Sequence, residues 1–243
     1  MKNPLVSIVT VTYNCRESLQ QTIDSIANQT YTNKEYVIID GGSSDGTIDV
    51  IRRNEEKVSF WLSEKDNGIF DAMNKALGHV SGDWLIFLNS GDIFYDNDVL
   101  QVCFKNEIGE EYGVVYGETY SRKGKLKMTP FIFHPHGFAP MGICHQSLFV
   151  RTSLAQKYRF SMKYKVAADY NMIRTIFNEG YKFYHVPHMI SVFDLNGFSK
   201  ANAFLQLKEV AEICDARHSP LYYWSVLRLK IKNLIKALIR YDS

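Results

Sequence analysis

Apolar runs alternate with helix-like segments over the first third of the chain. Four runs have the β-branched and aromatic content of buried strands, at residues 5–13, 35–40, 58–62 and 84–88. Between them, apolar side chains recur at helical spacing, which predicts helices at residues 16–28, 47–53 and 70–80. This alternation predicts βαβ units and a mostly parallel central sheet flanked by helices.

The pattern is less regular after Asp92. It predicts a helix at 99–104, a strand at 113–120, a basic turn at 122–127, and further helices at 153–158, 169–178 and 202–216. Residues 131–144 are rich in Pro, Gly, His and aromatic residues, which is more typical of a loop around a site than of a core, although an irregular connection has the same composition. We expect one α/β domain over residues 1–220, with a more regular part at 1–92 and a less regular part at 93–220.

The last segment, residues 221–243, has the pattern of a basic amphipathic helix. Its large aliphatic side chains recur at helical spacing: Leu227, Ile231, Leu234, Ile235 and Leu238. Its basic side chains follow another face at every fourth residue: Arg228, Lys232, Lys236 and Arg240. With aromatic residues at 222–224, this helix is suited to an anionic membrane surface. A helix packed on the domain, or a contact between two copies, is the alternative.

Composition narrows the classes of function. With 243 residues, 46% hydrophobic and 22% charged, the chain suits one compact domain with a short appendage. A net charge of +2 gives no nucleic-acid footprint, so we expect no nucleic-acid partner. The four scattered cysteines indicate free thiols in a reducing compartment, and neither a signal sequence nor a run of about 18 apolar residues is present. We expect a cytoplasmic protein, whose membrane contact would be peripheral at the inner face of the membrane.

Polar residues gather where three of the predicted strands end. The first cluster is Thr12, Tyr13 and Asn14, the second runs over residues 40–47 from Asp40, and the third is Asn89, Ser90, Gly91 and Asp92. In parallel α/β sheets, ligands bind beyond the carboxyl ends of the strands, so the clusters are expected to converge. Glycines allow close backbone approach, and carboxylates can accept hydrogen bonds from a base or ribose, or bind a cation. The clusters therefore predict a nucleotide pocket.

Three familiar nucleotide-binding classes do not fit these strand ends. A dinucleotide fold needs G-x-G-x-x-G after the first strand, where residues 12–14 read Thr-Tyr-Asn. A phosphate-loop NTPase needs Lys after its second Gly, whereas Thr47 follows Gly46 here. A sugar nucleotidyltransferase needs a Gly-rich basic loop after the first strand, which is also missing from the sequence.

Four segments carry a family resemblance, in the family's order and spacing: 6–14, 40–47, 63–75 and 82–92. Two shorter matches follow, His145 with Gln146 and residues 168–170. In these motifs the chain resembles the inverting glycosyltransferases of family 2, and within the family it resembles bacterial enzymes that build exopolysaccharide or O-antigen repeat units on a lipid carrier. The resemblance implies a GT-A-like α/β fold with a nucleotide-binding half at 1–92 and an acceptor-side half at 93–220. The donor would be a nucleotide-diphosphate sugar and the acceptor a saccharide or lipid-linked saccharide, near which the helix at 221–243 could lie on the membrane.

The resemblance also implies which residues hold the donor nucleoside. Thr12, Tyr13 and Asn14 would line the base pocket, Asp40 would accept a hydrogen bond from the base, and Asp66 would lie near the nucleoside. From the residues alone, Asp40 could instead be a turn residue and Asp66 a solvated loop charge. We favour the donor role for Asp40 because it ends a strand with a buried pattern.

The third cluster corresponds to the metal motif of the resembled family, which binds Mg²⁺ or Mn²⁺ against the donor diphosphate. Asp92 matches the last acid of this motif, but Asn89 stands at the usual first acid and Gly91 at the middle position, after Ser90. Asn89 can still hydrogen-bond a ribose, while the cation loses a nearby charge. A cation is expected because it stabilises the charge that grows on the leaving nucleoside diphosphate.

The acceptor needs a base that removes the hydroxyl proton during in-line attack, a task worth about 10²- to 10⁴-fold in rate. Asp169 matches the catalytic acid position of the resembled family, although it could also be a plain helix N-cap. His145, with Gln146 beside it, could be an acceptor-site group or a core-facing imidazole. In-line displacement would invert the anomeric configuration. A non-catalytic nucleotide- or sugar-binding module is the alternative, because the metal motif has lost acids.

Overall fold

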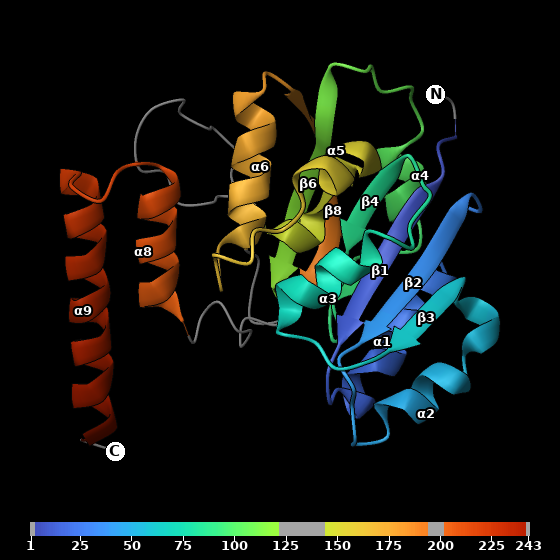
Figure 1. Ribbon diagram of the computed structural model, residues 1–243, viewed down its shortest axis with the longest axis horizontal. Helices are drawn as coiled ribbons and strands as arrows, with labels where there is room; N and C mark the ends of the chain where they lie inside the picture. The colour runs from blue at the N-terminus through green and yellow to red at the C-terminus, as the bar shows by residue number, and fades with distance from the viewer. Residues whose placement is uncertain (1–2, 122–143, 194–201, 242–243) are drawn as a thin grey trace.

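The computed structural model describes residues 3–121, 144–193 and 202–241, with no side chain beyond residue 235. Within these residues, the chain forms a central sheet with helices on both of its faces (Figure 1). The basic turn expected at 122–127 and nearly all of the loop expected at 131–144 lie outside the described residues.

The described strands are β1 (Val6–Thr12), β2 (Lys34–Asp40), β3 (Phe60–Ser63), β4 (Trp84–Phe87), β5 (Ile93–Phe94), β6 (Tyr112–Ser121), β7 (Leu148–Arg151) and β8 (Lys182–Phe193). The α-helices are α1 (Arg16–Ala27), α2 (Thr47–Arg52), α3 (Ile69–Ala76), α4 (Val99–Cys103), α5 (Thr152–Tyr158), α6 (Ala168–Asn178), α8 (Ala203–Ile213) and α9 (Pro220–Tyr241). Short 3₁₀ turns are η1 (Glu55–Lys57) and η2 (His145–Ser147).

The first four strands confirm the parallel sheet expected at the start of the chain. β1 pairs in parallel with β2 and with β4, and β2 pairs in parallel with β3. Every residue of β1 and β4 is buried, as expected for parallel strands that are covered on both faces. The helices expected between these strands are present as α1, α2 and α3, with ends that differ by a few residues.

The sequence pattern did not predict β5, β7 and β8. The strand order is β3-β2-β1-β4-β7-β6-β8-β5, so β7 inserts between β4 and β6, antiparallel to both. β7 has only four residues. β8 is longer, but it contains Pro187 and the polar residues His185 and His188, and its burial does not alternate. The elements expected at 113–120, 153–158, 169–178 and 202–216 are present as β6, α5, α6 and α8.

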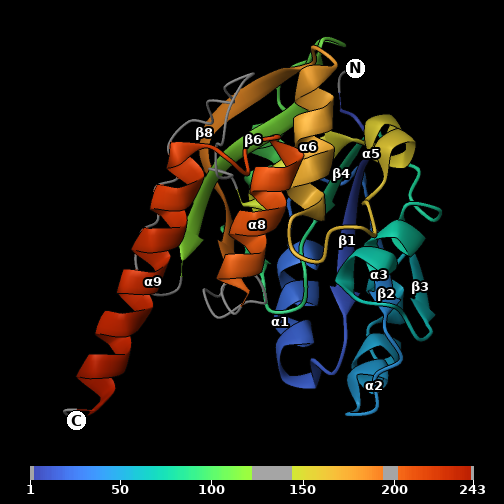
Figure 2. The ribbon, with the colours of Figure 1, turned by 60° about the vertical axis from the view of Figure 1, so that its left-hand side comes forward.

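Alternate side chains of the central strands face two core layers. Ile8 of β1 packs in the layer that contains α1, α2 and α4, whereas Val9 packs in the layer that contains α3, α5, α6 and α8. α9 lies beyond α8 at one side of the molecule, and its C-terminal end points away from the sheet (Figures 1 and 2). Because both faces of the sheet are covered, the loops at the strand ends are where a site can form.

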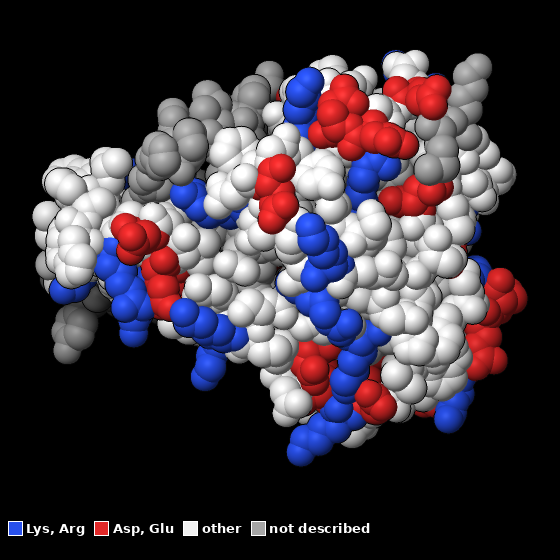
Figure 3. All heavy atoms as spheres, turned by 45° about the horizontal axis from the view of Figure 1, so that its top comes forward, with Lys and Arg blue, Asp and Glu red and all other residues white. Residues whose placement is uncertain are grey.

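Acidic and basic side chains are interspersed on the face of the molecule drawn in Figure 3. A band of Lys and Arg crosses the middle of this face, with acidic side chains on either side of it. Oppositely charged side chains also pair in the structure, as in the contact between Lys75 Nζ and Glu64 Oε1 (2.8 Å). This mixture agrees with the net charge of +2 and gives that face no broad field of one sign.

Asn74 joins α3 to the segment that follows α5. Its Nδ2 donates to the carbonyl oxygen of Phe160 (2.8 Å), and its Oδ1 accepts from the N–H of Phe160 (2.9 Å). Asn74 is buried, and the ring of Phe70 stacks on that of Phe160 with centroids 5.5 Å apart. The amide therefore satisfies both backbone groups of a buried residue on the way to α6.

Replacing Asn74 with Ala should lower the free energy of unfolding by about 2–4 kcal/mol, because both backbone groups of Phe160 lose their partner. Urea unfolding followed by tryptophan fluorescence measures the change. Replacing the neighbouring Lys75 with Ala removes its ion pairs with Glu64 and Asp71 and an exposed hydrogen bond to the carbonyl oxygen of Lys65, and should cost less than about 1 kcal/mol. An Asn74→Ala protein as stable as the wild type would show that the two hydrogen bonds to Phe160 do not stabilise the fold.

Candidate active site

The carboxyl ends of β1, β2 and β3 lie side by side. Thr12 is opposite Asp40 in the β1–β2 register, and Asp40 is opposite Ser63 in the β2–β3 register. β4 flanks β1 on its other side, and the N–H of Ser90 donates to the carbonyl oxygen of Val11 (3.4 Å). The three polar clusters expected from the sequence therefore meet at one edge of the sheet.

Asp40 is fully buried and organises the turn that follows β2. Its Oδ2 accepts hydrogen bonds from the N–H groups of Gly42 (3.1 Å) and Ser43 (2.9 Å) and from Ser63 Oγ (2.6 Å). Its Oδ1 accepts from Ser43 Oγ. Both carboxylate oxygens thus act within the turn, and a hydrogen bond from a donor base to Asp40 stays a prediction.

An aromatic ring and a carboxylate lie together beside this turn. Asn14 holds the end of β1 against it, since its Oδ1 accepts from the N–H of Ser44 (3.0 Å). A Cβ atom on Gly41 would lie 2.4 Å from Asp66 Oδ2 and 3.3 Å from Cδ2 of Tyr13, so both side chains lie against Gly41. The Tyr13 side chain is 61% exposed. A ring of this kind can stack on a base, and the adjacent carboxylate can accept a base N–H.

The turn after β4 carries the buried carboxylate of Asp92. Gly91 has φ +94°, a conformation that favours glycine, and its N–H donates to Thr22 Oγ1 (3.0 Å). Asp92 Oδ2 accepts a hydrogen bond from Gln146 Nε2 (3.1 Å). Within the described part of the chain, no group of three or more His, Cys, Asp or Glu side chains could hold a metal ion. An ion at Asp92 would therefore need oxygen ligands of other kinds.

Buried oxygens without hydrogen-bond partners lie on the adjacent ends of β1 and β4. They are Thr12 Oγ1, Asn89 Oδ1 and Ser90 Oγ. Leaving such an atom unsatisfied costs about 1–3 kcal/mol, and most buried polar atoms in proteins have partners. Amide and hydroxyl oxygens can accept hydrogen bonds from ribose hydroxyls or bind a hard cation. The residues present therefore fit a nucleotide with its cation, through neutral oxygens around a single carboxylate.

His145 connects the end of β4 to the first turn of α6. Asn89 Nδ2 lies 3.2 Å from His145 Nε2, and His145 Nδ1 lies 3.0 Å from Asp169 Oδ2. A neutral imidazole with its proton on Nδ1 satisfies both contacts, whereas an imidazolium would need the amide oxygen of Asn89 turned towards Nε2. The next residue, Gln146, donates to Asp92. η2 therefore lies between Asp92 and Asp169 and brings them to the same end of the sheet.

This geometry bears on the alternatives left open by the sequence. His145 is partly buried, with 22% of its side chain exposed, and it bridges two polar residues instead of facing the apolar core. The N-cap of α6 is Ala167, so Asp169 is not the capping residue but lies within the first turn. The roles of Asp169, His145 and Gln146 towards an acceptor stay predictions.

The charges around η2 change the pKa values of two side chains, one in η2 and one directly before it. Burial lowers the pKa of the His145 imidazole, but the hydrogen bond to Asp169 and the charges of Asp169 and Asp92 outweigh it, so the pKa lies above its ordinary value. Burial, and then the same two charges, raise the pKa of the Cys144 thiol, which donates to Gln146 Oε1 (2.8 Å). Cys144 was not identified as a site residue from the sequence. Its position directly before His145 is the one sequence signal that could have identified it.

Comparison with known families now decides the class. The model of a family described as Glycosyl transferase family 2 matches residues 7–190, which is more than half of the chain. The chain belongs to this family. It is therefore a glycosyltransferase, as the motifs in its first 92 residues indicated.

Relatives of this family 2 glycosyltransferase are found in several bacteria. An uncharacterized glycosyltransferase of Mycobacterium tuberculosis is 31% identical over 177 residues, 70% of this chain and 68% of that protein. A PGL/p-HBAD biosynthesis glycosyltransferase of Mycobacterium bovis is 32% identical over 177 residues, 70% of this chain and 69% of that protein. The putative teichuronic acid biosynthesis glycosyltransferase TuaG of Bacillus subtilis is 36% identical over 92 residues, 37% of this chain and 36% of TuaG.

Solved structures of low sequence identity confirm the GT-A fold. The mannosyltransferase PcManGT from Pyrobaculum calidifontis, in complex with GDP-Man and Mn²⁺, matches 86% of this chain with a TM-score of 0.68 and 19% identity. TarS of S. aureus, in complex with UDP-GlcNAc, matches 88% of this chain with a TM-score of 0.64 and 15% identity. This chain spans 63% of the mannosyltransferase and 66% of the TarS chain, under two thirds of each.

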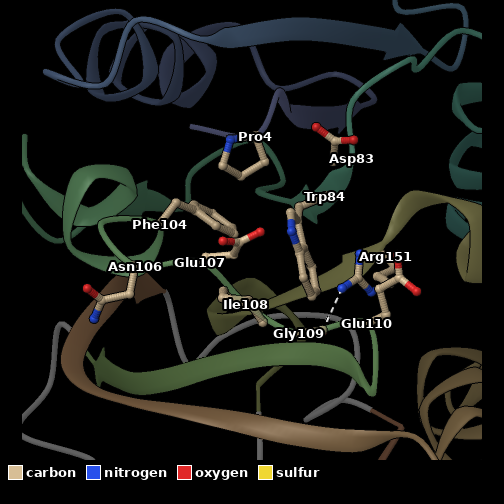
Figure 4. A pocket seen from close by; sticks show the side chains of 10 residues that line it. All are labelled: Pro4, Asp83, Trp84, Phe104, Asn106, Glu107, Ile108, Gly109, Glu110 and Arg151. Carbon is tan, nitrogen blue, oxygen red and sulfur yellow. Dashed lines mark hydrogen bonds between the residues drawn. The ribbon is translucent and has the colours of Figure 1, made fainter. Parts of the chain in front are cut away.

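A cavity of about 240 Å³ lies at the opposite end of the sheet from the candidate site (Figure 4). Pro4, just before β1, and Asp83, just before β4, are among its lining residues, so it lies at the amino ends of the parallel strands. The Arg151 guanidinium stacks 4.6 Å from the centroid of the Trp84 ring and donates to the carbonyl oxygen of Gly109 (2.7 Å). These contacts tie strands together, and the cavity is separate from the candidate site.

The His145–Asp169 pair should titrate measurably. Because the folded-state pKa of His145 is raised, the pair stabilises the fold fully below the ordinary pKa of about 6.5, and this contribution is lost as the pH rises through the folded-state value. Histidine NMR titration of the full chain measures that pKa. Asp169→Asn should lower it, whereas Asp49→Asn, an exposed change on α2, should leave it unaltered. A wild-type His145 that titrates at or below the ordinary value would contradict this geometry.

Proposed function

We propose that this family 2 glycosyltransferase transfers a sugar from a nucleotide-diphosphate donor to an acceptor hydroxyl with inversion of the anomeric configuration. One observation carries the proposal: Asp92 and Asp169 lie on either side of η2, at the sheet edge where Tyr13 and Asp66 also lie. A donor with its base over Tyr13 and its diphosphate beside Asp92 would present its sugar towards Asp169. Turnover with different nucleotide sugars, described below, identifies the base and the sugar of the donor.

A divalent cation, Mg²⁺ or Mn²⁺, belongs to this proposal. Asp92 would hold it together with phosphate oxygens of the donor, an arrangement typical of Mg²⁺, and Asn89 Oδ1 is a further oxygen in the same turn. When bound, such an ion stabilises the charge that develops on the leaving diphosphate. The mannosyltransferase of the same fold, which is in complex with GDP-Man and Mn²⁺, supports this assignment.

Asp169 is the proposed general base. Its Oδ2 is held by His145 Nδ1 at 3.0 Å, which fixes the carboxylate against rotation. The carboxylate takes the proton from the acceptor hydroxyl while the hydroxyl oxygen bonds to the anomeric carbon. The bond from that carbon to the phosphate oxygen breaks on the opposite side, and the electron pair leaves with the diphosphate. His145 and Gln146 would flank the acceptor, with His145 orienting the base.

The acceptor is proposed to be a saccharide or a lipid-linked saccharide in the synthesis of a bacterial surface glycan. The support comes from relatives named for PGL/p-HBAD biosynthesis and teichuronic acid biosynthesis. The alternative of a binding module without turnover loses weight because the matched family is one of transferases. Turnover of the wild type separates the two directly.

Replacing Asp169 with Asn should reduce kcat by about 10²- to 10⁴-fold, the usual contribution of a general base, and leave donor binding intact. Turnover is measured with UDP-, GDP- and dTDP-sugars in the presence of Mg²⁺ or Mn²⁺. Donor binding is measured by thermal shift, because a ligand that binds the native state raises the melting temperature. Asp49→Asn on α2 is the matched control and should retain full turnover. Full turnover by Asp169→Asn would exclude this residue as the base.

α9 is proposed to bind an anionic membrane surface next to such an acceptor. Tyr222 packs partly against the core beside α8, but none of the residues from 220 to 235 is buried, so the domain covers little of this helix. Its exposed large hydrophobic side chains are Leu221, Tyr223, Trp224, Leu227, Ile231, Leu234 and Ile235. Residues 220–241 include Arg and Lys but neither Asp nor Glu, a charge pattern that complements anionic lipid headgroups.

The proposed contact between α9 and the membrane would be peripheral. Among the described residues, no helix combines the length and apolar content needed to cross a membrane. Each Lys or Arg near an anionic surface contributes about 1 kcal/mol of attraction, in addition to burial of the apolar side chains. Membrane affinity should therefore depend on both the lipid charge and the apolar face of α9.

The full chain should sediment with phosphatidylcholine vesicles that contain phosphatidylglycerol, and much less with phosphatidylcholine alone. Leu227→Glu combined with Ile231→Glu should abolish the binding without lowering the melting temperature, because both side chains are exposed. The control combines Gln101→Glu with Lys105→Gln, exposed changes that alter net charge equally. Equal vesicle binding with and without residues 221–243 would refute the proposal. A dimer in sedimentation equilibrium that the Glu changes dissociate would replace it with a contact between two copies.

A further inference from the structure

Glu209 of α8 is a buried carboxylate that lies outside residues 7–190, the part of the chain that the family model matches. Its side chain points at the segment that leads into α6. Glu209 Oε1 accepts from the N–H of Lys165, and Oε2 accepts from the N–H groups of Val166 and Ala167, each at 2.9 Å. One carboxylate thus binds three consecutive backbone donors.

These three donors lie directly before the helix that carries Asp169, since Lys165 and Val166 precede its N-cap residue, Ala167, and α6 begins at Ala168. Ala167 is the N-cap residue of α6 and has no side-chain acceptor of its own for the helix N–H groups. A negative charge at this end interacts favourably with the helix dipole. Glu209 therefore binds the N–H of the N-cap residue and of the two residues before it, which fixes the point where α6 begins.

Other contacts attach α8 to the same region. Lys163 Nζ lies 2.6 Å from Glu212 Oε1, one turn of helix after Glu209. On the other side of Asp169, the hydroxyl of Tyr170 lies 3.1 Å from Cys214 Sγ. α8 thus binds the chain before and after Asp169, so the position of this residue relative to η2 depends on α8.

We propose that Glu209 is a positioning residue for Asp169, which fixes the first turn of α6 so that the carboxylate of Asp169 meets His145 in the orientation needed for proton removal. The proposal rests on the proposed role of Asp169 as the base. It adds that a residue beyond the matched family region sets the geometry of that base. Misplacing a catalytic group by about 1 Å can cost about 10²-fold in rate. The hydrogen bonds that Glu209 accepts from residues 165–167, which we call the Glu209 clamp, end two residues before Asp169, so losing them should lower turnover.

The test compares Glu209→Gln with a destabilising control in the same helix, using the full chain. Glu209→Gln keeps the size of the side chain but replaces one accepting oxygen by an NH₂ group that faces backbone donors. Val210→Ala removes buried apolar contacts one residue away and leaves the clamp intact. If Glu209→Gln does not fold, Glu209→Asp, which retains the charge but retracts it by one methylene, is measured in the same way.

Two readouts do not depend on activity. Hydrogen exchange at the amides of residues 165–167 should accelerate in Glu209→Gln and stay slow in Val210→Ala. In histidine NMR titrations, the pKa of His145 should fall towards that of Asp169→Asn in Glu209→Gln only, because Asp169 no longer holds the imidazole. Unchanged exchange and an unchanged His145 titration in Glu209→Gln would overturn the proposal even if the chain has no measurable turnover.

The kinetic readout uses whichever of the UDP-, GDP- and dTDP-sugars the wild type turns over. Glu209→Gln should lower kcat by about 10- to 10²-fold with the donor KM unchanged, and Val210→Ala should keep kcat at temperatures below its melting point. Adding Glu209→Gln to Asp169→Asn should cause no further loss, because both act through one group. Equal loss of kcat in Val210→Ala, or an additive loss in the double variant, would reduce Glu209 to a stability role. A wild type without turnover would instead refute the proposed function and leave the exchange and titration results to decide this one.

Discussion

Parallel pairing of β1 with β2 and β4 is the constraint on which the site depends. Because these strands run in the same direction, the turns after Thr12, Asp40 and Phe87 leave the sheet at one edge. The turn after β2 is held by the buried Asp40 carboxylate, and the turn after β4 by a glycine with positive φ. A rigid edge of this kind lets short polar segments, far apart in the sequence, meet with little further ordering cost.

The first half of the chain could be predicted from its sequence because its signals are local. Continuous apolar runs indicate parallel strands that are covered on both faces, and helical spacing between them indicates the crossovers. In the second half of the chain, β7 and β8 lack such local signals. β7 is four residues long and pairs with strands on both sides, so its identity depends on partners and not on its own pattern. β8 carries Pro187 and polar residues, which conceal a strand that the neighbouring β6 stabilises.

The candidate site also has one part that could be predicted from the sequence and another that could not. Strand-end residues such as Asp92 were predictable, because their position follows from the local pattern. The contacts that assemble them were not, because His145 bonds to Asn89 and to Asp169 across 56 and 24 residues of sequence. The same contacts offer a physical account of the altered metal motif. At the usual first acid, Asn89 presents a neutral amide to His145, where a carboxylate would add a further negative charge beside Asp92 and Asp169.

The clamp on α6 also has a consequence for how the chain matures. During synthesis, the amides of residues 165–167 leave the ribosome 42 to 44 residues before the carboxylate that binds them. Until that later segment has emerged, the N–H groups of residues 165–167 lack the acceptor that we propose positions Asp169. The nascent N-terminal half can fold its strand-end turns early, whereas the proposed transfer centre would be complete only after α8 has emerged.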